Sequence, residues 1–407
     1  MLNYGINNCK IVSIYRVGII IFVCVSTPFN EKEGTALVYI PLSRVKVGMT
    51  LAQSICASDG LYSLLEKGQV LTESIISKLS SHNVDGIYIE CKGSEDVEPK
   101  SIIRPEAKQQ LMSDFRSIYV SYYNKPFISP DAVNSTRRVA ESIVLAVLER
   151  EEFLADVMEI KSYDNYTYSH SLNVCILSTL IAIEMGITRN RLEDLALCAL
   201  MHDVGKIDIP IEIINKSGPV TDLEFDIIKT HPEKGVERLR KCYNISREIL
   251  QGVLGHHEKF DGTGYPYGSK GKHISLFARV LSVADVYDAL TSQRSYRKPW
   301  PPNEALEYII AGADSQFDFD VVQIFMHIVC AYPTGMIVTL SDESPALVIK
   351  NHPENVLRPR VRLIADTPLG NKGYEVDLFE DARYLHLTIV SIYGEDGCDF
   401  DLSDSLS

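Results

Sequence analysis

Hydrophobic and polar positions follow three different patterns along the chain. From Val38 to about Cys91, short apolar runs such as "VYIPL" and "DGIYIE" alternate with turn residues, which is typical of short strands. One helix is expected among them, from Thr72 to His82. We therefore predict a small α+β module over residues 38–92.

A helical period dominates the middle of the chain. A polar stretch with prolines precedes it, and we expect a linker or helical connector over residues 93–130. The run after Pro130 places its apolar residues on one helical stripe, at Val139, Ile143, Val144 and Val147. Thr221 and Glu224 have the spacing of a capping box. We predict a helical bundle over residues 131–330.

Strand patterns return after Pro333. Runs such as "GMIVTL", "PALVIKN" and "LHLTIVSIY" are rich in β-formers and are broken by Gly, Asp, Asn and Pro. A small β-rich segment is therefore predicted over residues 331–395, followed by an acidic tail over 396–407. The fold class is mainly α, with one small module on each side of the bundle.

The first 37 residues are interpreted as a leader that lies upstream of the natural start of a domain at Val38. The apolar run at 17–27 follows Lys10 and Arg16, so a signal peptide is the alternative, but no A-x-A cleavage site follows it. The run is too short to span a bilayer, which takes about 20 residues. We expect no stable membrane insertion.

Composition excludes some classes of partner. A chain of 407 residues with 45% hydrophobic residues is long enough for two or three domains. Its 40 basic and 54 acidic residues give a net charge of −14, which argues against binding to a nucleic acid polymer. The nine cysteines form no CxxC pair, so reduced thiols and a cytoplasmic location are expected.

Five of the ten histidines lie in the helical region with carboxylates beside or between them. The set comprises His170, His202, Asp203, His231, His256, His257 and Asp285. Imidazole nitrogen and carboxylate oxygen together suit divalent transition metals, and one carboxylate can bridge two ions. Adjacent side chains on a helix diverge, so His256 and His257 converge on one ion only at the end of a helix. These residues predict a dinuclear metal site.

Three ordered motifs, "MHDVGKIDIP" (201–210), "HHEKFDGTGYP" (256–266) and "VADVYDALTSQRSYR" (283–297), resemble the HD-GYP family of the HD phosphohydrolase superfamily. The resemblance covers roughly residues 135–330 and implies an HD-type helical bundle. It also implies hydrolysis of cyclic di-GMP, a bacterial second messenger, to linear pGpG or GMP.

The resemblance implies a ligand set for each metal. One ion would be bound by His170, His202, Asp203 and Asp285. The second would be bound by Asp203, His231, His256 and His257, so that Asp203 bridges the two. Some members of the family bind a third ion through a glutamate whose position is Tyr166 here, so two ions are expected. Iron or manganese is the preferred pair, with nickel or zinc as alternatives.

The chemistry of the reaction fits two ions. Attack of hydroxide on a phosphodiester adds negative charge, and two divalent ions offset it and bring the pKa of a shared water toward about 7. A metal-bridged hydroxide is then the nucleophile. Asp203 is expected to be catalytic because it bridges the two ions that bind this hydroxide. Lys206, three residues after Asp203 on the same helical face, is expected at the scissile phosphate or its leaving oxygen.

Other residues are expected around the substrate. The resemblance places Arg294 and Arg297 near the ligand, where their planar guanidinium groups suit a phosphate or a guanine edge. Asp288 and Asp164 are expected to support ligands instead of binding metal. In the "DGTGYP" turn, Gly262 and Gly264 are expected to adopt backbone angles closed to other residues. Tyr265 would contact the substrate base, with packing as its alternative role.

Three positions depart from the family pattern. Asp314 and Phe319 stand where the family often has Gly and Pro, and Ser295 replaces a common Pro.

The sequence leaves three functions open. The preferred function is a cyclic di-GMP phosphodiesterase. The alternatives are hydrolysis of another cyclic nucleotide or dinucleotide, and a sensor or partner-binding module without turnover. A homodimer, and contact with a cyclic di-GMP synthase through the GYP loop, are possible partner interactions under this reading.

Overall fold

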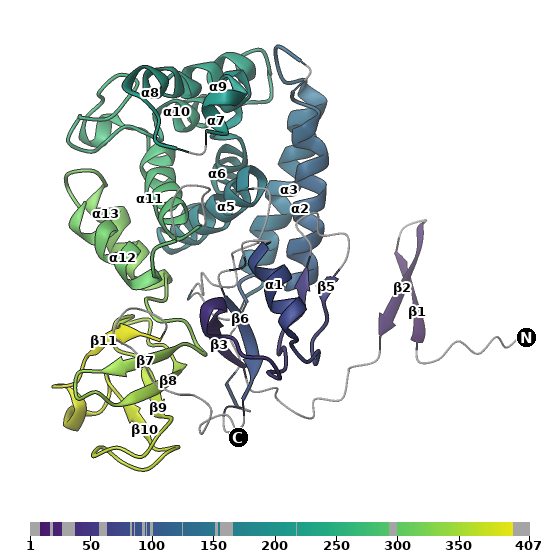
Figure 1. Cartoon of the computed structure of the whole chain (residues 1–407). Helices are drawn as coiled ribbons and strands as arrows, with labels where there is room; N and C mark the ends of the chain where they lie inside the picture. The colour runs from purple at the N-terminus through teal and green to yellow at the C-terminus, as the bar shows by residue number, and fades with distance from the viewer. Residues whose placement is uncertain are drawn as a thin grey trace, which may run out of the picture.

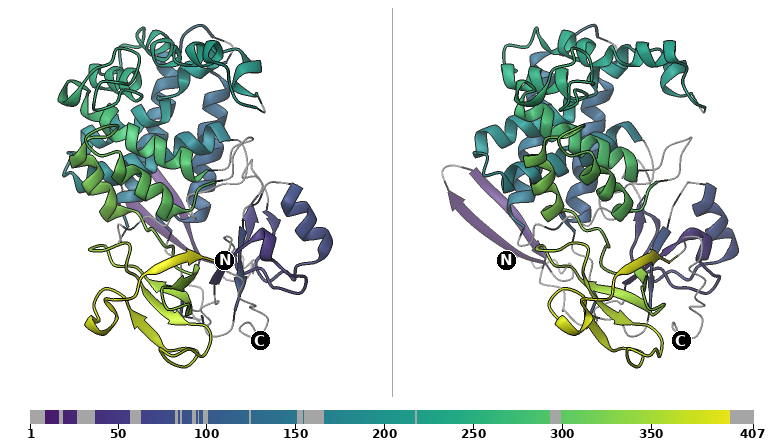
Figure 2. Two further views of the ribbon diagram at one scale, coloured as in Figure 1. Left: turned by 60° about the vertical axis from the view of Figure 1, so that its left-hand side comes forward. Right: turned by 90° about the vertical axis from the view of Figure 1, so that its left-hand side faces the viewer.

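The computed structural model describes the chain over residues 9–16, 19–26, 37–56, 63–81, 84, 86–91, 94, 96–97, 101–123, 125–150, 154, 166–216, 218–292 and 299–393. Helices occupy one end of the molecule, and an N-terminal module and a C-terminal sheet lie beside one another at the other end (Figures 1 and 2). The mainly α fold class predicted from the sequence is confirmed. Among the described residues, none of the helices is long and apolar enough to cross a membrane.

The helical region is built around α5 and α11, most of whose described side chains are buried. The longer helices are α3 (Pro130–Leu148), α5 (Tyr166–Glu184), α6 (Arg189–Met201), α9 (His231–Leu239), α10 (Arg247–Gly255), α11 (Leu276–Thr291), α12 (Pro302–Ala311) and α13 (Phe319–Ile328). Shorter turns are η2 (Val204–Asp208), α7 (Ile211–Ile214), α8 (Asp222–Ile228) and η3 (Gly271–His273). Bulky residues such as Phe277, Tyr287 and Phe325 are fully buried between them. This packing fixes the ends of α5, α6, α9 and α10 relative to one another.

Local signals explain where several helices begin. Thr221 accepts a hydrogen bond from the Glu224 amide, and the Glu224 side chain accepts one from the Thr221 amide, so the predicted capping box of α8 is confirmed. Ser129 caps α3 and Pro130 occupies its first turn, which needs no amide donor there. Phe319 stands at the first position of α13, where a proline is also well tolerated.

The predicted connector contains a long helix, α2 (Pro105–Val120), which belongs to the main core. Leu111, Phe115 and Tyr119 are buried against α3 and α5. After Tyr122 the chain turns and enters α3. The segment between the N-terminal module and the bundle is therefore largely a packed helix and not a loose linker.

The N-terminal module pairs short strands around one helix. Its elements are β3 (Leu37–Pro41), η1 (Leu42–Arg44), β4 (Ile55–Cys56), β5 (Ser63–Leu65), α1 (Glu73–Ser81) and β6 (Gly86–Glu90). Strands β3 and β6 are antiparallel, as are β4 and β5. The helix α1 lies within the range predicted from the sequence. Upstream, β1 (Cys9–Arg16) and β2 (Ile19–Ser26) form an antiparallel pair within the predicted leader.

The C-terminal segment forms an antiparallel sheet in the order β10-β9-β8-β7-β11. Its elements are β7 (Ile337–Leu340), β8 (Pro345–Lys350), β9 (Arg360–Leu363), β10 (Glu375–Asp377), η4 (Ala382–Tyr384) and β11 (Ile389–Ile392). Val338, Val348 and Val361 join the main core, whereas Ile337 and Leu347 face the N-terminal module. One set of its side chains thus joins the core of the helical region, and the other joins the core of the N-terminal module.

The N-terminal module and the C-terminal sheet share one hydrophobic core. Val38, Ile40 and Ile89 of the module cluster with Leu347 and Tyr393 of the C-terminal segment. The Tyr39 amide donates to the Gly335 carbonyl at 2.8 Å, and the Arg362 guanidinium forms two hydrogen bonds with the Asp96 carboxylate. The two modules that the sequence places at opposite ends of the chain therefore form a single unit.

This shared core predicts the effect of truncating Leu347, which is 3% exposed. Leu347→Ala should lower the free energy of unfolding by about 2–5 kcal/mol, because it removes buried methyl groups and leaves a cavity. Val390→Ala, at a side chain that is 61% exposed, should change it by less than about 0.5 kcal/mol. Urea unfolding of both variants measures the difference, and equal effects would contradict a shared core.

Candidate metal centre

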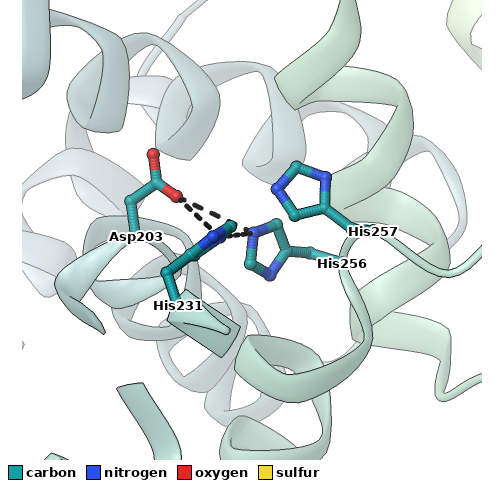
Figure 3. A group of neighbouring side chains, drawn as sticks. All are labelled: Asp203, His231, His256 and His257. Atoms are coloured by element: carbon teal, nitrogen blue, oxygen red, sulfur yellow. Dashed lines mark hydrogen bonds and ion pairs between the residues drawn. The ribbon is translucent and has the colours of Figure 1, made fainter. Parts of the chain in front are cut away.

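The seven predicted ligands come from five segments and meet at one place. His170 lies in α5, His202 follows the last residue of α6, and Asp203 precedes η2. His231 opens α9, His256 and His257 follow α10, and Asp285 lies in the middle of α11. All are buried except His257, which is partly exposed. Figure 3 shows Asp203, His231, His256 and His257 directed toward a common space.

The position of the histidine doublet confirms the expected helix end. Helix α10 stops at Gly255, with His256 as its C-cap. The rings of His256 and His257 lie 4.1 Å apart between centroids at an angle of 43°. Both therefore face the same side, which successive residues inside a helix do not do.

Asp203 stands between two groups of donors. Its Oδ2 lies 3.3 Å from His202 Nε2 and 3.7 Å from His170 Nε2. Its Oδ1 lies 3.3 Å from His231 Nε2 and 3.8 Å from His256 Nε2. Each carboxylate oxygen thus serves a different group, which is the geometry of a bridging ligand.

Second hydrogen bonds fix the orientation of three imidazoles. The Nδ1 atoms of His202, His231 and His256 each lie 2.7–2.8 Å from the carbonyl oxygen of the residue three positions earlier. A carbonyl only accepts, so each Nδ1 carries the proton and each Nε2 keeps its lone pair toward Asp203. This tautomer is the one that binds metal through Nε2.

His170 is oriented by a carboxylate instead. Its Nδ1 lies 2.7 Å from Asp288 Oδ2, and Asn173 donates to Asp288 Oδ1 at 2.8 Å. Its Nε2 lies 3.2 Å from Asp285 Oδ1. Asp288 therefore contacts the ring nitrogen of His170 that does not face the other ligands. This position fits the supporting role expected for Asp288.

Burial and charge set the protonation of the cluster. Burial opposes the charged form of His170, but its hydrogen bonds to Asp285 and Asp288 raise its pKa to about 9. Burial lowers the pKa of His257 to about 3. Burial alone would raise the pKa of Asp203, but Lys206 and His202 bring it well below its usual value. The Asp203 and Asp285 carboxylates are therefore charged and the His256 and His257 imidazoles neutral, which are the forms that bind metal.

The donor atoms fit two divalent ions. Asp203, His231, His256 and His257 form one group and His170, His202 and Asp285 another, each with its ligand atoms within 4.8 Å of one another. Atoms bound to one ion at about 2.1 Å lie about 3 Å apart, close to the separations found here. His202 Nε2 and Asp203 Oδ1 are buried and make no hydrogen bond within the described part of the chain. An ion would give both atoms a partner.

Lys206 and Tyr265 lie at the rim of the cluster. Lys206 Nζ forms an ion pair with Asp203 Oδ2 at 2.5 Å, and about a third of its side chain is exposed. The Tyr265 ring stacks on His257, with centroids 4.8 Å apart and an angle of 28°. Burial raises the pKa of the Tyr265 hydroxyl, so it remains a neutral donor. Both side chains therefore border the donor set.

The two glycines of the GYP turn serve different needs. Gly262 has φ +87°, which favours glycine, as expected. The expectation was wrong for Gly264, whose backbone angles are ordinary. A Cβ there would lie 2.2 Å from the Lys259 amide nitrogen and 2.5 Å from the His257 carbonyl oxygen. Gly264 is required because the turn folds back onto the chain beside His257.

Several residues that shape the site were not singled out from the sequence. The buried Glu258 carboxylate accepts hydrogen bonds from the Tyr267 and Ser269 amides and so closes the GYP loop. Gly205 lets η2 pack on α9, since a Cβ there would lie 1.9 Å from the His231 carbonyl oxygen. Glu258 adjoins the histidine doublet and Gly205 follows the His-Asp pair. The sequence signal that could have identified Glu258 and Gly205 was their position next to these motifs.

Some predicted residues lie outside the described part of the chain. These are Asp164, Arg294, Ser295 and Arg297, and the side chain of Tyr166 is likewise not described. Asp314 is described and adopts φ +58°, a left-handed conformation in which glycine is favoured. This explains why the family pattern often has glycine at that position.

Comparison with known proteins gives a consistent result. Residues 152–321 match the family described as HD domain. A cyclic di-GMP phosphodiesterase of Pseudomonas aeruginosa is 30% identical over 357 residues, which cover 80% of this chain and 84% of that protein. A 3'3'-cGAMP-specific phosphodiesterase of Vibrio cholerae is 25% identical over 321 residues, 78% of this chain and 58% of that protein.

Coverage differs among the similar proteins. The chain spans about half the length of some other curated relatives. Among solved structures, an HDG"Y"P protein from Bdellovibrio bacteriovorus matches with a TM-score of 0.47 and 18% identity, over 71% of this chain and 98% of that chain.

The close approach at Gly205 predicts a specific defect. Gly205→Ala should separate η2 from α9 and thereby move Asp203 away from His231, with a loss of stability of at least about 2 kcal/mol. Gly218→Ala is the matched control, because nothing lies within 4 Å of the added methyl group. Thermal unfolding and metal content of the purified variants test this. A Gly205→Ala protein with normal stability and metal content would show that the contact is unimportant.

Proposed function

Because the chain belongs to the HD-GYP family of HD-domain phosphohydrolases, it is a phosphodiesterase, and we propose that its substrate is cyclic di-GMP. The observation that carries the proposal is the buried Asp203 carboxylate, with one oxygen directed to His170 and His202 and the other to His231 and His256. That arrangement suits two adjacent divalent ions. Hydrolysis would give linear pGpG, GMP or both.

The seven side chains would hold the two ions in the sets expected from the family. When bound, the ions supply positive charge for the phosphodiester and make hydroxide available near neutral pH. Asp203 would be the shared ligand. The other imidazoles are held in the tautomer that binds metal through Nε2. At His257 it is Nδ1 that faces Asp285, at a distance of 3.9 Å. We propose iron or manganese, because imidazole and carboxylate donors suit both.

Residues at the rim would position the substrate. Lys206 exchanges part of its interaction with Asp203 for a non-bridging or leaving oxygen of the phosphate, and its exposed fraction allows this reach. Tyr265, held against His257, offers a ring face or a hydroxyl to a guanine base. The absence of a side chain at Gly264 keeps the turn beside His257. By motif, Arg294 and Arg297 would bind phosphate or guanine, and Asp164 would support a ligand.

Cyclic GMP-AMP is the second candidate substrate, and a relative of this specificity covers most of the chain. Both compounds present the same phosphodiester to the metal ligands, so the distinction depends on contacts with the bases. A cyclic di-GMP synthase is proposed as a protein partner of the GYP loop, together with homodimer formation. A cytoplasmic location is proposed as well, where thiols are kept reduced.

Replacement of the bridging carboxylate tests the mechanism. Asp203→Asn should bind less metal and lose turnover of cyclic di-GMP by at least about 1,000-fold, because the reaction loses several kcal/mol of charge stabilisation. The control is Asp226→Asn, because the Asp226 carboxylate is 64% exposed and forms a surface ion pair with Lys229. Elemental analysis and chromatography of the products, both on anaerobically purified protein, are the measurements. Full turnover by Asp203→Asn would refute a bridging role.

A substrate panel tests the specificity. Wild-type protein loaded with iron or manganese should hydrolyse cyclic di-GMP with a higher kcat/KM than 3'3'-cGAMP or cyclic di-AMP, and treatment with a chelator should abolish all three activities. A preference for 3'3'-cGAMP would favour the second candidate. Binding of the dinucleotides without any product from metal-loaded protein would refute the enzymatic proposal.

A further inference from the structure

Arg238, in α9, is a buried cation that the sequence motifs do not include. Its side chain is 5% exposed and lies two helical turns after His231. Its guanidinium donates to both carboxylate oxygens of Asp208, from Nε at 2.5 Å and from Nη2 at 2.6 Å. Its Nη1 donates to the carbonyl oxygens of Tyr122 at 3.1 Å and Lys125 at 2.8 Å. The planar group therefore serves three separate acceptors at once.

These acceptors belong to segments that reach the metal centre. Asp208 is the last residue of η2, the turn that begins directly after Asp203. Arg238 shares the short helix α9 with His231. The ion pair therefore joins the segment that carries Asp203 to the helix that carries His231. The ligand atoms Asp203 Oδ1 and His231 Nε2 lie only 3.3 Å apart.

The other contacts of Arg238 tie both segments to the end of the connector helix. Tyr122 and Lys125 follow α2, and the Ile128 amide donates back to the Arg238 carbonyl at 3.2 Å. The Tyr122 hydroxyl is hydrogen-bonded to Thr136 of α3, which holds this turn in place. The connector also packs on the helix of His170, because the Tyr119 ring lies edge-on to Tyr168 at 5.3 Å.

Lysine could not replace this arginine. An ammonium is a point charge that can satisfy one oxygen of Asp208 or one carbonyl but lacks the fork that spans all of them. Loss of the bidentate pair would let η2 slide relative to α9. Because Gly205 brings these two segments into close backbone contact, a small shift would change the distance between Asp203 and His231.

We propose that Arg238 is a positioning residue for the metal centre, which holds the segments of Asp203 and His231 in register by clamping both to the turn after α2. This inference rests on the proposed metal-dependent function. It assigns to Arg238 no contact with metal or substrate. Its effect is therefore expected on metal affinity first, and on catalysis only through the bound metal.

The test compares two substitutions at the clamp with one nearby control. Arg238→Lys keeps the charge but not the planar fork, and Asp208→Asn removes the charge of the partner, whose side chain is 39% exposed. Arg240→Lys is the control, since Arg240 forms a surface ion pair with the exposed Glu237 one turn away. Affinity for Mn²⁺ is measured by titration of the metal-free full-length chain, with circular dichroism and thermal unfolding as measures of folding.

Both clamp variants should bind Mn²⁺ about 10-fold or more weakly than wild type, as is typical when a group behind a ligand is lost. The double variant should be no worse than the more severe single one, because both substitutions break the same contact. Saturating Mn²⁺ should restore much of the kcat, with the KM for cyclic di-GMP unchanged. Arg240→Lys should match wild type throughout.

Two results would overturn the inference. One is unchanged Mn²⁺ affinity in a clamp variant whose metal-free melting temperature falls, which would make the clamp a stabilising contact only. The other is additive loss of affinity in the double variant. If Arg238→Lys does not fold, Asp208→Asn alone decides by its Mn²⁺ affinity. Because that readout needs no substrate, a wild type without cyclic di-GMP turnover would refute the proposed function and leave this test intact.

Discussion

The structure depends on one buried carboxylate that faces two sets of imidazoles. Asp203 is charged and almost inaccessible to water, a state that is unfavourable unless fixed positive charge surrounds it. Lys206 offsets part of that charge, and a metal ion at each oxygen would offset the rest. The oxygens of Asp203 must reach histidines on different helices. For this reason η2, the start of α9 and the end of α10 lie close together.

Helix ends provide the convergence that helix faces cannot. His202, His231 and His256 occupy the end of α6, the start of α9 and the end of α10, where each Nδ1 meets a carbonyl three residues earlier. The backbone thus sets the tautomer of the ligand without a further side chain. His170 lies inside a helix and needs a carboxylate, Asp288, for the same purpose. Close packing of the intervening turns depends on the missing side chains of Gly205 and Gly264.

The sequence predicted what depends on local pattern and on residue type. The helical bundle, the capping box at Thr221, the β-rich C-terminal segment and the meeting of His256 with His257 were all legible there. Contacts between distant residues were not. Glu258 and Arg238 were not singled out from the sequence, because their partners lie nine or more residues away and only the folded chain brings them together. Gly264 was identified, but as a site of unusual backbone angles, because no local pattern reveals a close approach of backbone atoms.

The connector helix α2 lies between the shared core of the two terminal modules and the core of the helical bundle. Val97 packs in the shared core, whereas Ile102, a few residues later, packs in the core of the helical bundle. From there α2 runs for 16 residues, about 24 Å at 1.5 Å per residue, and ends at the turn that Arg238 grips. A packed helix transmits displacement along its axis, whereas a flexible linker dissipates it. The turn that follows α2 contacts Arg238, and Arg238 pairs with Asp208 at the end of η2, so the connector helix is joined to the segment of Asp203.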